Sequence, residues 1–229
     1  MTLLDFTALD YVALGWFLTC WIGFSIFADH SRWGARSTTG IMTGYRRRWM
    51  HMMLHRENRI VDANILGNLL NGVAFFASTS IFAIGGVLAM LAAGDVAVQI
   101  ITDLPFADAT SRLAWELKTL LLVVTLIFAF FKFARAFQLY NYCSILIGAA
   151  PSAVENTPEA QAMADRAAGM NILAASHFSR GIRAYFFALA LLSWFVHPMP
   201  FIAATAWVVL VIYRREFRSR SLQIIADQL

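Results

Sequence analysis

The sequence predicts an all-α protein, a polytopic transmembrane helical bundle with cytoplasmic helical extensions. Of its 229 residues, 59% are hydrophobic and 14% are charged, whereas a soluble domain carries roughly a quarter of charged residues. Long apolar stretches alternate with polar loops, and a helix that crosses a bilayer needs about 20 apolar residues. The spans and their loops account for the whole chain, so we expect residues 1–229 to form a single integral membrane domain.

Five apolar stretches are the predicted spans, at residues 9–28, 65–93, 113–131, 184–196 and 201–213. The last two are short and are separated by His197-Pro198-Met199-Pro200, where the prolines interrupt a helix. They therefore form a predicted short hairpin. We favour two complete crossings over a re-entrant hairpin, because non-helical backbone at membrane depth needs protein or water around it.

The distribution of basic residues predicts the orientation. When the five stretches are threaded through a bilayer, sixteen of the eighteen Lys and Arg residues fall on one side, and only Arg112 and Lys118 fall on the other. Loops rich in Lys and Arg stay in the cytoplasm. We therefore expect the N-terminus outside the cytoplasm and the C-terminus inside it.

Two cytoplasmic segments have helical patterns. Residues 46–61 are predicted to form a helix that lies along the headgroups or leads directly into the second span. A second helix is predicted to open at Thr157-Pro158, because Thr is a good N-cap and Pro suits the first turn. We expect this helix to run to Met170.

Four segments of the chain resemble a known family. The run RENRIVDANILGNLLNGVAFFASTS covers residues 56–80, NYCSILIGAAP covers 141–151, HFSRGIRAYFFALALLSWFVHP covers 177–198 and YRREFRSRS covers 213–221. Together they resemble the bacterial integral membrane family "domain of unknown function 599" over most of the chain. The resemblance implies an inner-membrane location and supports the topology. It implies no reaction, substrate, ligand or catalytic residue.

Three amides define a polar face on the second predicted span. Asn64, Asn68 and Asn71 follow spacings of four and three, so they share one face of a helix. One interpretation is a polar lining for a pore or substrate path. The other is helix packing, since amides that bond across membrane helices stabilise their association by about 0.6 kcal/mol each. We consider packing the more common use of such residues.

A second candidate site is a cytoplasmic charge cluster at the level where spans two and three meet the cytoplasm. Its residues are Arg56, Glu57, Arg59, Asp62, Lys132 and Arg135. Charges near lipid are costly unless they are paired, so these groups are expected to form a network. The network is either a site for an ion or an anionic headgroup, or a structural clamp between the two spans. We prefer the clamp, because structural ion pairs are common.

Two histidine-containing segments complete the candidates. His177, Arg180 and Arg183 form a basic and polar segment before span four, but the Ser-His hydrolase pattern lacks its acid and its strand-turn-helix context. His51 and His55 are four residues apart and form a weak candidate metal pair, since a secure site needs three or four ligands. We therefore expect no catalytic residue, metal or cofactor.

Three functions stay open. The first is a non-enzymatic, oligomerising channel- or transporter-like bundle. The alternative is a structural or accessory subunit of a larger membrane complex, and the third is a membrane-embedded lipid-modifying enzyme that uses His177 or Glu57 and Asp62. The expected partners are a bilayer with anionic headgroups and either further copies of the chain or other membrane subunits. Nucleic acid is not expected, because orientation and attraction to anionic lipid explain the basic residues.

Overall fold

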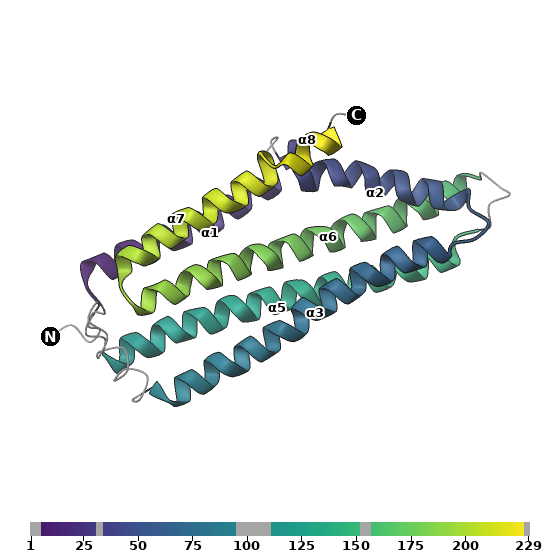
Figure 1. The fold of residues 1–229 in the computed structure, drawn as a ribbon. Helices are drawn as coiled ribbons and strands as arrows, with labels where there is room; N and C mark the ends of the chain where they lie inside the picture. The colour runs from purple at the N-terminus through teal and green to yellow at the C-terminus, as the bar shows by residue number, and fades with distance from the viewer. Residues whose placement is uncertain (1–5, 31–33, 95–110, 152–156, 227–229) are drawn as a thin grey trace. The chain divides into compact units, whose positions relative to one another are not determined.

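The computed structural model describes residues 6–30, 34–94, 111–151 and 157–226, and every regular element in these ranges is helical (Figure 1). The long helices are α1 (Ala8–His30), α2 (Thr38–Leu54), α3 (Ile60–Ala92), α5 (Arg112–Ala149), α6 (Pro158–Leu192) and α7 (Pro198–Phe217). The short elements are η1 (Gly34–Arg36), η2 (Ser193–Phe195) and α8 (Arg220–Ala226). The predicted fold class, all-α, is therefore confirmed.

Among the described residues, three helices are long and apolar enough to cross a membrane, namely α1, α3 and α5. Helices α3 and α5 contain 33 and 38 residues, which at about 1.5 Å per residue is longer than the roughly 30 Å of hydrocarbon. Helix α6 carries Arg180 and Arg183 before its apolar end, and α7 closes with Arg214 and Arg215. These charges shorten the apolar runs of α6 and α7.

The region before α3 differs from the sequence-based prediction. Helix α2 begins at Thr38, where the Ser37 hydroxyl accepts a hydrogen bond from the Gly40 amide at 3.1 Å, and it ends at Leu54. Helix α3 begins at Ile60, whose amide donates to the Asn58 side chain at 2.9 Å. The helix predicted over 46–61 is therefore wrong at both ends, because two side-chain caps set the boundaries that hydrophobic periodicity does not reveal.

The predicted start of the second cytoplasmic helix is confirmed. Helix α6 begins at Pro158, and the Thr157 hydroxyl accepts a hydrogen bond from the Ala160 amide at 3.2 Å. The helix does not end near Met170 but continues without a break to Leu192. The proline-rich segment then separates it from α7, which begins at Pro198, a position where the fixed φ of proline suits a first turn.

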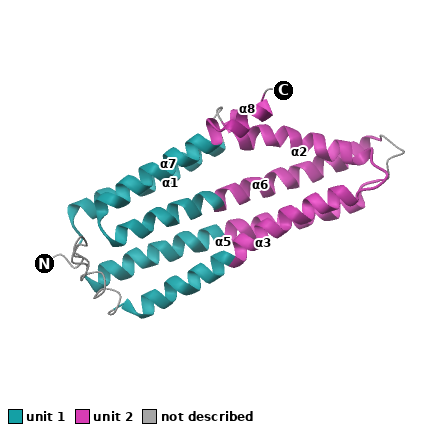
Figure 2. Cartoon of the chain, in the orientation of Figure 1, with its two compact units in different colours: residues 1–31, 79–129, 182–215 teal, residues 32–78, 130–181, 216–229 magenta. Residues whose placement is uncertain are grey.

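The chain divides into two compact units (Figure 2). Unit 1 contains residues 1–31, 79–129 and 182–215, and its described core is rich in aromatic rings. Phe17 and Phe201 are fully buried with ring centroids 5.3 Å apart, and Trp194 stacks on Phe201 at 4.9 Å. These contacts join α1 to α7, and they join α7 to η2, the short helix that follows α6.

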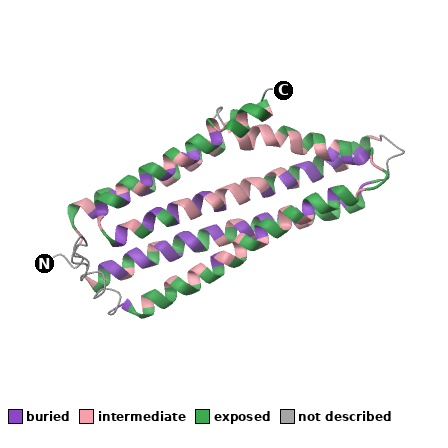
Figure 3. Ribbon diagram, in the orientation of Figure 1, coloured by how far each residue is buried: buried purple, intermediate pink, exposed green. Residues whose placement is uncertain are grey.

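Unit 2 contains residues 32–78, 130–181 and 216–229. Its aromatic core brings α3, α5 and α6 together through Phe76, Phe133 and Phe178, whose ring centroids lie 5.5–5.7 Å apart. Helices α5 and α6 approach closely at Gly181, since a Cβ there would lie 2.5 Å from the Phe133 ring. The outward side of α3 is largely exposed, as Figure 3 shows.

Candidate functional site

The polar face of α3, formed by Asn64, Asn68 and Asn71, is exposed along its whole length. Helix α3 is also the least covered of the three long apolar helices, with 11% of its most apolar stretch buried against 39% in α5. Gly67 and Gly72 lie among the amides, and a Cβ at either would meet nothing within 4 Å. Contacts among the residues that the structure describes therefore leave this face uncovered.

The charge cluster begins with a buried ion pair at the start of α3. The Asp62 side chain is fully buried, and its Oδ1 accepts a hydrogen bond from Trp49 Nε1 at 2.6 Å and another from Arg56 Nη1. Its Oδ2 has no hydrogen-bond partner among the residues that the structure describes. The Arg56 side chain is 39% exposed. The ion pair connects the segment after α2 to α3, Trp49 connects α2 itself to α3, and the carboxylate is the more buried member of the pair.

Arg59 contacts a different element. Its Nη1 donates to the carbonyl oxygens of Ile147 at 3.0 Å and Ala150 at 2.8 Å, and its Nη2 donates to the Pro151 carbonyl. Unsatisfied carbonyls at a helix C-terminus carry partial negative charge and favour a cation. Arg59 therefore satisfies the end of α5 from the start of α3.

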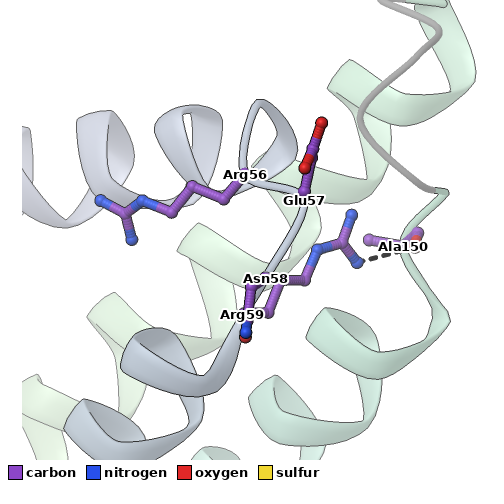
Figure 4. Close-up of a pocket in the computed structure, with 5 residues that line it drawn as sticks. All are labelled: Arg56, Glu57, Asn58, Arg59 and Ala150. Atoms are coloured by element: carbon purple, nitrogen blue, oxygen red, sulfur yellow. Dashed lines mark hydrogen bonds between the residues drawn. The ribbon is translucent and has the colours of Figure 1, made fainter.

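These residues surround a shallow pocket of about 400 Å³, lined by Arg56, Glu57, Asn58, Arg59 and Ala150 (Figure 4). Figure 4 shows that the two guanidinium groups point in different directions, and that of Arg59 points to Ala150. Both arginines already donate to acceptors of this chain. The geometry is that of a link between helices, because the strongest donors at the pocket are engaged.

Lys132 and Arg135 are not brought to this pocket. Lys132 lies 15 residues before Ile147 on α5, which corresponds to about 22 Å along the helix. The two cations instead lie near His177, together with Arg180. Burial, followed by the charges of these three neighbours, holds the pKa of His177 below its ordinary value.

Arg183 has a separate environment from His177. The Arg183 side chain is buried, and its Nη2 donates to Asp29 Oδ1 at 2.7 Å within unit 1. His177 and Arg180 belong to unit 2, where the Nδ1 atom of His177 is buried and has no hydrogen-bond partner in the described part of the chain. The three residues of the polar segment before span four therefore divide between the two units.

The histidine pair is also separated by its contacts. His51 Nε2 lies 2.9 Å from Asp165 Oδ1, whereas His55 is exposed at the end of α2. Asp62 is engaged with Trp49 and Arg56. Within the described ranges, no group of three or more His, Cys, Asp or Glu residues is arranged to hold a metal ion.

One buried polar cluster in unit 1 was missed by sequence reasoning. Trp194 Nε1 donates to Asp10 Oδ1 at 2.8 Å, and Lys118 Nζ donates to the Trp194 carbonyl at 3.1 Å. Lys118 Nζ also lies 3.9 Å from Asp10 Oδ1, and both charged side chains are less than 10% exposed. The signal was present, because Asp10 and Lys118 each lie inside a predicted span, where an ionisable residue seeks a partner.

A comparison with known protein families identifies the family of this chain. The model of a family described as "Protein of unknown function, DUF599" matches residues 12–221. The match covers most of the chain, so the protein belongs to this family, as the sequence motifs predicted. No curated protein and no solved structure matches the chain.

Proposed function

We propose that this protein is a non-enzymatic channel- or transporter-like bundle of the bacterial inner membrane, which oligomerises so that the polar face of α3 lines a path for a polar solute or ion. The exposure of Asn64, Asn68 and Asn71 on a helix of membrane-crossing length carries the proposal. Amides of such a helix need hydrogen-bond partners, since lipid offers none. Water in a path, or another protein, supplies them.

The proposed topology has five spans, with the N-terminus in the periplasm and the C-terminus in the cytoplasm. Asp10 and Asp29 lie 19 residues apart on α1, which is about 28 Å along the helix and close to the hydrocarbon thickness. Each is paired with a buried cation of unit 1, Asp10 with Lys118 and Asp29 with Arg183. Ion pairs at both margins of an apolar layer support complete crossings by the short apolar runs of α6 and α7.

The path is tested by cysteine scanning in membranes. Asn64, Asn68 and Asn71 are replaced one at a time by Cys in a variant that lacks Cys20 and Cys143, and a soluble, membrane-impermeant thiol reagent is applied from each side. We expect labelling at all three positions. Cysteine at Leu66, which is 2% exposed on the covered side of α3, is the protected control. Uniform protection of the three asparagine positions contradicts the path.

A structural or accessory subunit is the second candidate function, and Gly67 and Gly72 favour it. Small residues with open space before them let another helix approach closely. Such a subunit is expected to co-purify with a different membrane protein after gentle extraction. Purification as an assembly of this chain alone argues against the accessory role.

A further inference from the structure

The exposed side of α3 has the composition of an interface. Asn64, Asn68 and Gly72 follow one another at intervals of four residues, so they form a row along the helix. We call this set the Asn64–Gly72 row. Exposed apolar side chains flank it, with Val61, Ile65 and Phe75 exposed by 59%, 40% and 64%. Lipid can cover the apolar groups, but it cannot bond the amides.

Packing among the described residues of the chain does not explain the glycines on this side of α3. Glycine inside a helix costs about 1 kcal/mol relative to alanine. At Gly181 the cost has a reason, since a Cβ would overlap the Phe133 ring at 2.5 Å. At Gly67 and Gly72 a Cβ would meet nothing within 4 Å. Their use is explained when a helix from outside the chain approaches the α3 backbone closely.

The occupant that fits is a second copy of the same chain. A primary amide has two donor hydrogens and an acceptor oxygen, so a row of asparagines is complementary to itself. Residues 63–92 of α3 contain no charged side chain, so two such helices meet without repulsion between like charges. Copies with one orientation in the membrane also present parallel α3 helices, which a two-fold axis normal to the membrane brings together.

We propose that two copies of this protein pair through the Asn64–Gly72 rows of parallel α3 helices, with amides of one copy bonded to those of the other. The inference rests on the proposed function, because it names the partner that covers the polar face of α3. It adds that both copies contribute amides to the interface and that Gly72 sets how closely the two backbones approach.

The pairing is tested by disulfide cross-linking in native membranes. Asn68→Cys is introduced into the variant without Cys20 and Cys143, and copper phenanthroline with dissolved oxygen is the oxidant. Each disulfide forms from two thiols with loss of two electrons and two protons to that oxidant. We expect a cross-linked dimer that persists when the protein is diluted in reconstituted lipid. Ile81→Cys is the matched control, because Ile81 is 56% exposed on the opposite side of α3.

Gly72→Leu tests the close approach. Its side chain enters open space within one chain, so the fold of the single chain is retained, while the approach of a second backbone is blocked. We expect the Asn68→Cys cross-link to fall several-fold and the detergent-solubilised protein to elute as a monomer. Gly169→Leu is the control for a bulky side chain at an exposed helical glycine with open space, and it is expected to leave the cross-link unchanged.

The outcomes separate the pairing from the path. Cross-linking at position 68 with protection from the soluble thiol reagent supports the pairing and contradicts the path. Labelling by that reagent without a cross-link at position 68 supports a path formed by another arrangement of copies and overturns the pairing. Equal cross-linking at positions 68 and 81, a monomer in lipid, or a cross-link to a protein of different mass also overturns the pairing.

Discussion

Unequal costs are expected when the two members of the Arg56–Asp62 pair are removed separately. Breaking a buried ion pair from one side costs about 3–5 kcal/mol, because the remaining charge stays buried. Arg56→Gln leaves the fully buried Asp62 carboxylate with Trp49 alone. Since the Arg56 side chain is 39% exposed, solvent screening reduces the expected cost to about 2–3 kcal/mol.

The opposite change is expected to be milder. Asp62→Asn keeps an acceptor for Trp49, and the exposed Arg56 side chain can turn to water. We expect a cost of about 1 kcal/mol, the net value of a typical hydrogen bond. The double variant should cost about as much as Asp62→Asn alone, because no buried charge then remains. The coupling between the two positions is therefore expected to be about 2 kcal/mol.

The assay is reversible unfolding of the purified protein in mixed micelles by titration with a denaturing detergent, followed by tryptophan fluorescence. Arg47→Gln is the matched control, since Arg47 is an exposed arginine of α2, the helix that precedes Arg56, and its effect should stay within about 0.5 kcal/mol. The reasoning fails if Asp62→Asn costs at least as much as Arg56→Gln. It also fails if the two single costs add in the double variant.

Three further outcomes follow from the packing and the charges. Gly181→Ala is expected to lower the thermal midpoint in detergent, because its Cβ overlaps a ring, whereas Gly169→Ala should raise it slightly; equal effects would contradict the close approach. The pKa of His177 is lowered in the folded protein, whereas the unfolded chain takes up the proton near the ordinary value of about 6.5. Stability is therefore expected to fall as the pH is lowered through about 6.5. A His177→Gln variant whose stability has the same pH profile as that of the unmodified protein would exclude the effect. Lys118→Met leaves the Asp10 carboxylate buried without its cation, with an expected loss of about 3 kcal/mol in the same unfolding titration, and an unchanged midpoint would show that the pair is not coupled.

Short-range patterns in the sequence predicted the helical fold class and the start of one helix correctly. The helical class follows from long apolar stretches, and the start of α6 follows from a threonine cap before a proline. The start of α2 was missed although Ser37 is an equally good cap, because the helix after it has weak periodicity and its polar residues resemble a loop. Prediction was therefore accurate where a proline follows the cap and inaccurate where Thr38, Thr39 and Gly40 follow it.

Long-range contacts were beyond the reach of sequence patterns. Arg59 bonds carbonyl oxygens about 90 positions later, and Asp10 meets Trp194 across 184 positions. Backbone carbonyls carry no sequence signature, so the partner of Arg59 depends on where α5 ends. The predicted cluster grouped charges by membrane level, but 15 residues of helix separate Lys132 from Ile147, which lies near the end of α5.

The asparagine face shows how the structure narrows an interpretation that the sequence left open. The spacing of Asn64, Asn68 and Asn71 predicted a shared face, and it allowed either a polar lining or packing between helices of one chain. Packing within one chain would bury the amides, yet all three are exposed. If these residues hold helices together, the second helix is none of the helices that the structure describes in this chain. Gly72 supports the same reasoning. A Cβ at Gly72 would meet no described atom within 4 Å, whereas a Cβ at Gly181 would overlap the Phe133 ring.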